Sequence, residues 1–159
     1  MSVYAFDDKA KSIKINKTDL PAPWINYLSN GNLHAFVSQV GGGFLWYKDA
    51  IDCRISRYRM NHFPIDSPGF YIYIKNEDGT VWSPAFRPTE EKLDDWSATH
   101  SAGETTYYAK HGDTEAYLKL YITPDYDVLV WELEIKNNGK TVHNYDCFAY
   151  VELAQFSWH

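Results

Sequence analysis

The 159 residues match the length of one ordinary domain, and a hydrophobic share of 45% is enough to bury a core, which excludes a disordered chain. A formal net charge of −6 without any Lys/Arg cluster argues against nucleic acid and anionic membrane surfaces as partners. The aromatic share of 17% is typical of half-buried pleated surfaces, so we expect an all-β fold.

The first 17 residues hold no apolar run behind a basic start. Neither a signal peptide nor a transmembrane span is therefore predicted, and we expect a cytoplasmic protein. Cys53 and Cys147 lie far apart with no CxxC pattern, which predicts two free thiols in a reducing compartment. No internal period or linker divides the chain, so we expect one domain over residues 1–159.

Residues 18–32 contain two prolines and fit neither regular period, which indicates an irregular covering segment. The glycine triplet 41–43 precedes the aromatic run 44–47. That run is strand-like and the GxGxxG spacing is absent, so a phosphate cradle is disfavoured. A tight turn or bulge between strands remains open, as does a place where the backbone approaches another body closely.

Turn residues predict two hairpins farther along the chain, joining 69–75 to 80–84 and 105–110 to 115–123. Residues 115–123 and 127–137 alternate between apolar and polar side chains, so each is a strand with two different faces. A strand at about 142–153 follows a short break, which predicts antiparallel pairing with its predecessor. About nine to eleven strands with one apolar face each predict an antiparallel β-sandwich.

Metal and nucleophile motifs are missing from the sequence. The six histidines form no HxH or HExxH pattern and no GxSxG occurs, so no metal site and no catalytic triad is predicted. Acidic doublets at 7–8, 90–91 and 94–95 are typical of solvated surface, and the sequence singles out no catalytic carboxylate.

The stretch 52–66, DCRISRYRMNHFPID, is the most suggestive for binding. Arginine forks and amides bind sugar or phosphate oxygens, and Trp or Tyr faces stack on the C–H side of a pyranose ring. An Arg–Tyr ladder at a strand edge, or an interface ion-pair cluster, explains the pattern equally well. Residues proposed for the substrate side or an interface are Trp46, Tyr47, Arg57, Arg59 and Asn61.

Five collinear blocks carry a family resemblance: FDD at 6–8, PAPWINYLSNGNLHAFVSQVGGGFLWYKDA at 21–50, RISRYRMN at 54–61, DSPGFYIYIKNEDGTVWSPAF at 66–86 and NNGKTVHNYDCFAYVEL at 137–153. They resemble the N-terminal β-sandwich of glycoside hydrolase family 94, a galactose-mutarotase-like super-sandwich. That family includes the cellobiose, cellodextrin, laminaribiose and chitobiose phosphorylases and the cyclic glucan synthases.

The resemblance implies cleavage of a β-glucosidic disaccharide or oligosaccharide by inorganic phosphate, with inversion to an α-sugar 1-phosphate and without another cofactor. In the family the general-acid aspartate lies on a following (α/α)6 barrel. This chain would then supply scaffold and interface rather than a catalytic residue, with its sandwich truncated at the C-terminal end. Expected partners are the saccharide, the barrel domain or fragment, and a second copy in a homo-oligomer.

Two observations limit what the resemblance implies. The arginine-bearing loop that reaches the family's active site has no counterpart here, and residues 100–104 read HSAGE where many relatives have HGLGY. The disaccharide therefore stays open. Glycines 41–43 are interpreted as allowing a close backbone approach. Alternative functions are a stand-alone carbohydrate-binding β-sandwich module and a purely structural remnant.

Overall fold

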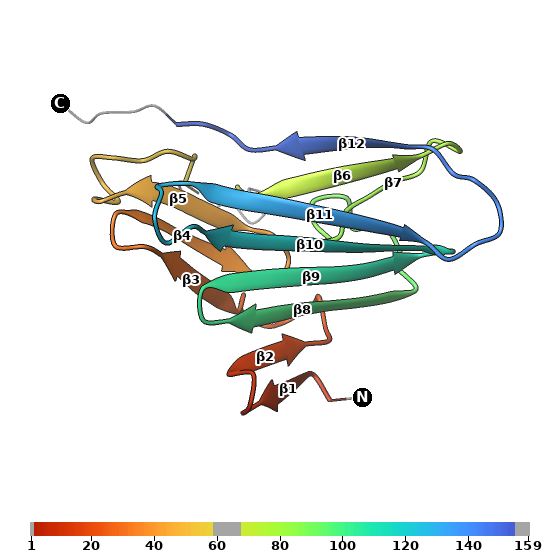
Figure 1. Ribbon diagram of the computed structural model, residues 1–159, viewed down its shortest axis with the longest axis horizontal. Coiled ribbons are helices and arrows are strands. Elements are labelled where there is room, and N and C mark those ends of the chain that lie inside the picture. Colours follow the sequence, from red (N-terminus) through yellow and green to blue (C-terminus); the bar gives the residue numbers. More distant parts are fainter. Residues whose placement is uncertain (1, 59–67, 155–159) are drawn as a thin grey trace.

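The computed structural model describes residues 2–58 and 68–154, and in these ranges the chain forms twelve strands and no helix (Figure 1). The expected all-β antiparallel sandwich is confirmed. The strands are β1 (Tyr4–Asp7), β2 (Ser12–Ile15), β3 (Ile25–Ser29), β4 (Leu33–Ser38), β5 (Gly43–Tyr47), β6 (Tyr71–Asn76), β7 (Val81–Trp82), β8 (Asp95–Ser101), β9 (Glu104–His111), β10 (Thr114–Ile122), β11 (Leu129–Asn137) and β12 (Tyr145–Tyr150).

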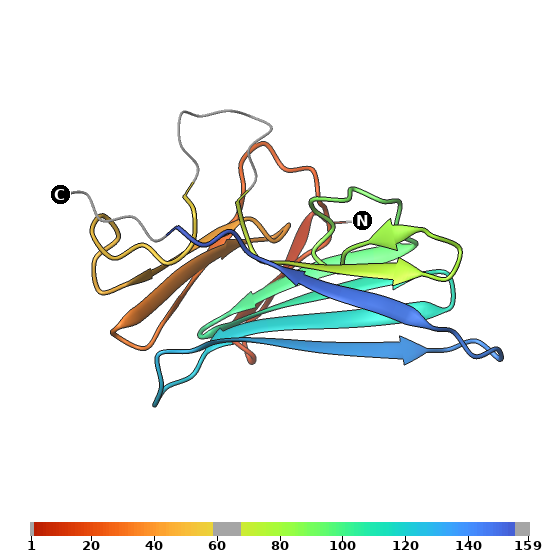
Figure 2. The same cartoon turned by 90° about the horizontal axis from the view of Figure 1, so that it is seen from above.

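The described strands form three sheets in two layers. One layer is a six-stranded sheet in the order β1-β2-β8-β9-β10-β11. Two three-stranded sheets, β12-β6-β7 and β3-β4-β5, lie against it in the other layer, and Figure 2 shows them next to each other along its length. The apolar faces of all three sheets meet between the layers, where they form the core.

Strand β10 shows how the sequence dictates this layering. Ala116, Leu118 and Leu120 are fully buried, whereas the intervening Tyr117 and Lys119 are half-buried on the outer face. Burying one leucine side chain completely contributes about 1.5–3 kcal/mol to stability. A register shift of one residue would expose this whole set, so the alternation fixes both the face and the register of the strand.

The strand expected at 142–153 is shorter and has another partner than its position in the chain predicts. It is β12, which pairs with β6 in the second layer and not with β11. At the start of the connection, Asn138 N–H donates to the Asp113 carbonyl, which holds it against the β9–β10 turn, and Asn137 Nδ2 donates to the Thr141 carbonyl within the connection itself. From there the chain crosses to the other layer.

The irregular segment expected at 18–32 is also corrected. Residues 25–29 form β3, which pairs with β4 along its full length. The backbone of Trp24 just before it is held at both polar groups: its N–H donates to Gln39 Oε1 at 2.9 Å, and its carbonyl accepts from His100 Nε2 at 3.2 Å. The two prolines therefore shape only the entry to the strand.

The glycine triplet packs backbone against backbone. Gly43 N–H donates to the Pro68 carbonyl at 2.9 Å, and Phe70 N–H donates to the Gly41 carbonyl at 3.0 Å. Gly41 has a φ of 87°, which favours glycine over L side chains. The alternative of a tight turn between strands is thus confirmed, because the glycines join β4 to β5 and Gly41 N–H donates to the Ser38 carbonyl at 3.2 Å. The backbone that approaches them closely belongs to the same chain, and the expected approach to another body stays a prediction.

Cys53 and Cys147 are free and exposed, as expected from their spacing. Among the described residues, no helical segment has the length and apolar character that crossing a bilayer requires.

Candidate functional site

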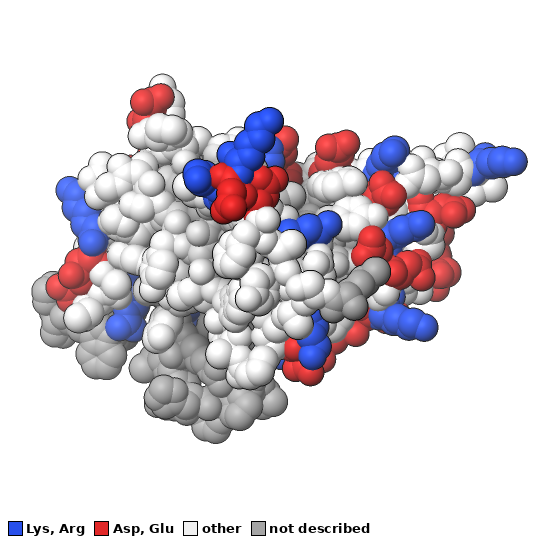
Figure 3. All heavy atoms as spheres, turned by 90° about the horizontal axis from the view of Figure 1, so that it is seen from below, with Lys and Arg blue, Asp and Glu red and all other residues white. Residues whose placement is uncertain are grey.

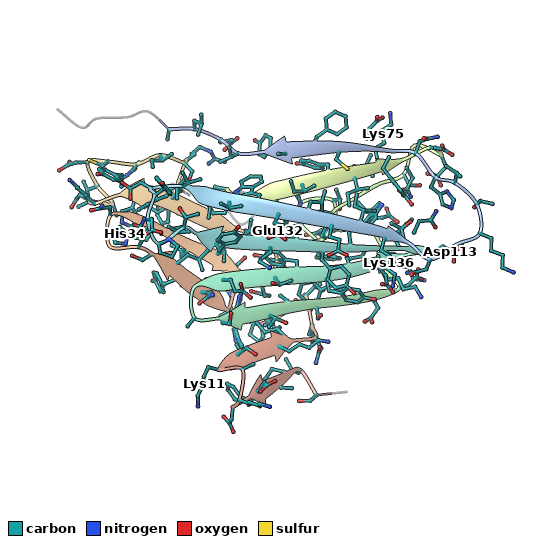
Figure 4. All side chains as sticks on the ribbon, in the orientation of Figure 1. Lys11, His34, Lys75, Asp113, Glu132 and Lys136 are labelled. Carbon is teal, nitrogen blue, oxygen red and sulfur yellow. The ribbon has the colours of Figure 1, made fainter. Side chains whose placement is uncertain are left out.

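The outer face of the β3-β4-β5 sheet is aromatic because of how its strands are paired. Alternation directs residues 33, 35 and 37 of β4 into the core and residues 34 and 36 outward. The register then places Tyr27, Phe36 and Phe44 in one row across the three strands and His34 beside Trp46 in the next. Figure 4 shows His34 at this end of the molecule, far from Asp113 and Lys136.

Two of the sequence-based candidates, Trp46 and Tyr47, lie on opposite faces of β5. Trp46 is on the outer face, nearly parallel to Phe44 (centroid distance 5.2 Å) and to His34 (5.4 Å). Tyr47 faces the other way and packs half-buried against the core, with Lys48 Nζ 5.1 Å from its ring centroid. Only Trp46 therefore belongs to the aromatic face.

A concave site, here called the aromatic hollow, lies on this face. Its volume is ≈ 320 Å³. Its lining is aromatic except for one alanine and one arginine: Tyr27, Phe36, Phe44, Trp46, Ala50, Arg54 and Tyr58. A second hollow of ≈ 250 Å³ shares Phe36 and Tyr58 with it. In the view from below, uncharged residues occupy much of the middle of the molecule, and charged groups lie at the left, along the top and at the right (Figure 3).

The segment after β5 carries the arginine into the hollow. The Asp49 carboxylate accepts the N–H groups of Ile51 at 2.7 Å and Asp52 at 2.9 Å, which closes a turn. These bonds, the one from Asp52 first, hold the pKa of Asp49 below its usual value. The backbone of Arg54 forms an isolated antiparallel β-bridge with that of Trp46. The Arg54 side chain donates from Nε to the Ala50 carbonyl at 3.1 Å.

Arg57, another candidate, points to a different neighbour. Its backbone N–H donates to the Glu152 carbonyl at 2.8 Å, and its Nε pairs with the Glu152 carboxylate, to which Tyr150 also donates at 2.8 Å. Each partner of the ion pair is 38% exposed. This contact fits the ion-pair alternative considered for the arginine-rich stretch. The candidates Arg59 and Asn61 lie outside the described residues.

A polar hollow of ≈ 400 Å³ lies at the opposite end, between the β6–β7 turn, the β9–β10 turn and the chain before β12. His111 stacks on Trp82 at 5.5 Å there, and Thr114 Oγ1 lies 2.6 Å from the Tyr145 hydroxyl oxygen. Within residues 2–58 and 68–154, no three His, Cys, Asp or Glu side chains gather closely enough to hold a metal ion.

Sequence reasoning singled out Trp46 but not its neighbours Tyr27, Phe36, Phe44 and Arg54. The signal for the outer face was the alternation in LHAFVS at 33–38 followed by GFLWY at 43–47. Each short strand carries only two or three outward residues. Their gathering becomes visible once the cross-strand register is known.

Comparison with known proteins gives one family and several relatives. Residues 10–157 match the family model of the glycosyl hydrolase 94 supersandwich domain. An N,N'-diacetylchitobiose phosphorylase of Vibrio furnissii is 30% identical over 152 residues, which are 94% of this chain and 19% of the relative. The solabiose phosphorylase of Paenibacillus borealis is 24% identical, with 94% of this chain and 20% of the relative covered. The chain thus spans about a fifth of the length of these relatives.

Proposed function

Since the chain belongs to glycosyl hydrolase family 94 through its supersandwich domain, we propose that it is the N-terminal, non-catalytic part of an inverting glycoside phosphorylase. The parent enzyme cleaves a β-glucosidic disaccharide or oligosaccharide with inorganic phosphate and releases an α-sugar 1-phosphate. The observation that carries this proposal is the match over 94% of this chain to relatives that are named as phosphorylases and are about five times longer.

The role of this chain is scaffold and interface. A general acid for glycoside cleavage needs a pKa raised toward the working pH. Among the described residues, the two carboxyl groups with a clear shift go the other way, since backbone N–H donors lower the pKa of Asp49 and of Asp78. We assign the general acid and the phosphate site to the catalytic barrel domain, the proposed partner of this chain, as the family resemblance implies.

The exposed surface supports an interface role. Phe148 and Tyr150, on β12, are 55% and 41% exposed, and Leu153 just after that strand is 65% exposed. Exposed apolar groups gathered in this way are typical of contact surfaces. We assign them to contacts with the barrel domain and with a second copy in a cytoplasmic homo-oligomer.

A chimera tests the assignment. Residues 10–157 replace the matching segment of the Vibrio furnissii phosphorylase, and the hybrid is assayed for phosphate-dependent cleavage of N,N'-diacetylchitobiose. We expect activity within about tenfold of the relative, because the catalytic groups stay in place. A matched control carries the same replacement with Gly43→Ala, which disrupts the packing of this domain. A well-folded hybrid without activity would contradict the proposal.

A further inference from the structure

We propose that the aromatic hollow is a saccharide-binding site, with a β-linked, gluco-configured disaccharide or longer chain as its ligand. The choice of a saccharide rests on the proposed function, whereas the site itself rests on the geometry of this chain. Its volume of ≈ 320 Å³ is in the range of about 300–1,000 Å³ that is typical of small-molecule sites.

The walls of the hollow are held in place without a ligand. Phe44 packs on Tyr58 at a centroid distance of 5.0 Å, and Phe36 lies 6.3 Å from Tyr58 at an interplanar angle of 85°. Tyr27 meets Phe36 edge-on at 6.2 Å. Rings that brace one another lose little conformational freedom when a ligand arrives. The C–H faces of a gluco-configured pyranose are flat because its substituents are equatorial, so they suit such walls.

Arg54 supplies the polar contact. The bond from its Nε to the Ala50 carbonyl fixes the plane of the guanidinium, and the turn closed by Asp49 fixes Ala50. Within residues 2–58 and 68–154, its terminal Nη groups have no hydrogen-bond or ion-pair partner, and no Asp or Glu lines the hollow. Both Nη groups are therefore available to donate to sugar hydroxyl or ring oxygens.

The hollow thus combines what a sugar ring requires: the exposed rings of Tyr27 and Tyr58 for the C–H faces and, in Arg54, a pre-oriented donor for the oxygens. The polar hollow near His111 lacks comparable aromatic walls, because most of its lining side chains are polar and bond to one another. The competing occupant of the aromatic hollow is a protein surface. If a protein surface occupies the hollow instead, titration of the chain with a sugar should show no saturable binding.

The test is a titration of the 159-residue chain with cellobiose, cellotetraose and N,N'-diacetylchitobiose, followed by calorimetry and by NMR. We expect saturable binding of at least one sugar with a Kd on the order of 1 mM. Tyr27→Ala and Arg54→Gln should each weaken it about tenfold, since each removes one of the contacts described. Tyr126→Ala is the matched control, because Tyr126 is 72% exposed between β10 and β11 and lies outside the hollow.

Urea midpoints of all variants establish that they fold. Absence of saturable binding overturns the proposal, and so does binding that Tyr27→Ala and Arg54→Gln leave unchanged, because the sugar then sits elsewhere. The titration involves no phosphorolysis. Saturable binding beside an inactive chimera would therefore reject the proposed function and retain the saccharide site.

Discussion

Replacing Gly41 by alanine should destabilise the domain through two separable effects. Its φ of 87° costs an L residue about 1–2 kcal/mol. A Cβ there would also lie 2.8 Å from Ala85 Cβ and 3.0 Å from the ring of Tyr71, and overpacking of this kind costs about 1–3 kcal/mol. We expect Gly41→Ala to lower the free energy of unfolding by about 2–5 kcal/mol.

Gly79 offers a matched control, because its φ is 89° and a Cβ added there meets nothing within 4 Å. Gly79→Ala should therefore cost only the backbone part, about 1–2 kcal/mol. Gly43→Ala isolates the overpacking cost, since the φ of Gly43 is not positive and an added Cβ would lie 2.6 Å from the Phe36 carbonyl oxygen. That variant should cost about 1–3 kcal/mol.

Urea denaturation followed by tryptophan fluorescence measures the three losses. For a chain of this length each kcal/mol corresponds to about 2–4 °C in Tm. Equal losses for Gly41→Ala and Gly79→Ala, together with a neutral Gly43→Ala, would refute the close backbone packing that we assign to the glycine triplet.

Three further expectations follow from other parts of the molecule. Burial lowers the pKa of His100, with a smaller opposing effect of its bond to the Trp24 carbonyl, so the unfolded chain binds the proton better. The free energy of unfolding should therefore decrease as the pH falls from about 6.5 toward the depressed pKa, and this slope should flatten in His100→Gln. Glu152→Gln should cost only about 0.5–1 kcal/mol, because the ion pair with Arg57 is 38% exposed on both sides, and high salt should diminish the difference in urea midpoints. Within the described residues, β11 and β12 are end strands with one neighbour each, so light scattering on the isolated chain should show self-association, and a clean monomer at high concentration would contradict this.

The strands with the strongest alternation were predictable from sequence alone. Residues 115–123 and 127–137 each have one face in the core, so period two dominates their pattern and their hairpin partners follow from short turns. Strand β12 shows the limit of this reasoning. Its partner β6 lies about 70 residues away, and no local pattern reveals a pairing over that distance. Strand β3 was missed because the prolines at 21 and 23 obscured a five-residue strand.

The candidate site was predictable only in part for a similar reason. Trp46 stood out by residue type, and the structure places it on the aromatic face. Tyr47 stood out equally, but alternation along β5 turns it toward the core. Arg54 enters the hollow because the turn closed by Asp49 redirects the chain. The residues around Arg54 in the sequence do not predict this change of direction. The surface thus depends on register and turn geometry more than on composition.

The most direct test of the central claim, that this chain is a non-catalytic part of a phosphorylase, is a phosphorolysis assay with the chain alone and with the polypeptide that makes up the remaining length of the Vibrio furnissii relative. Release of sugar 1-phosphate is measured with N,N'-diacetylchitobiose and inorganic phosphate. We expect none from the 159-residue chain by itself and turnover when the two polypeptides are combined. Turnover by the chain alone, at a rate proportional to its concentration, would contradict the account.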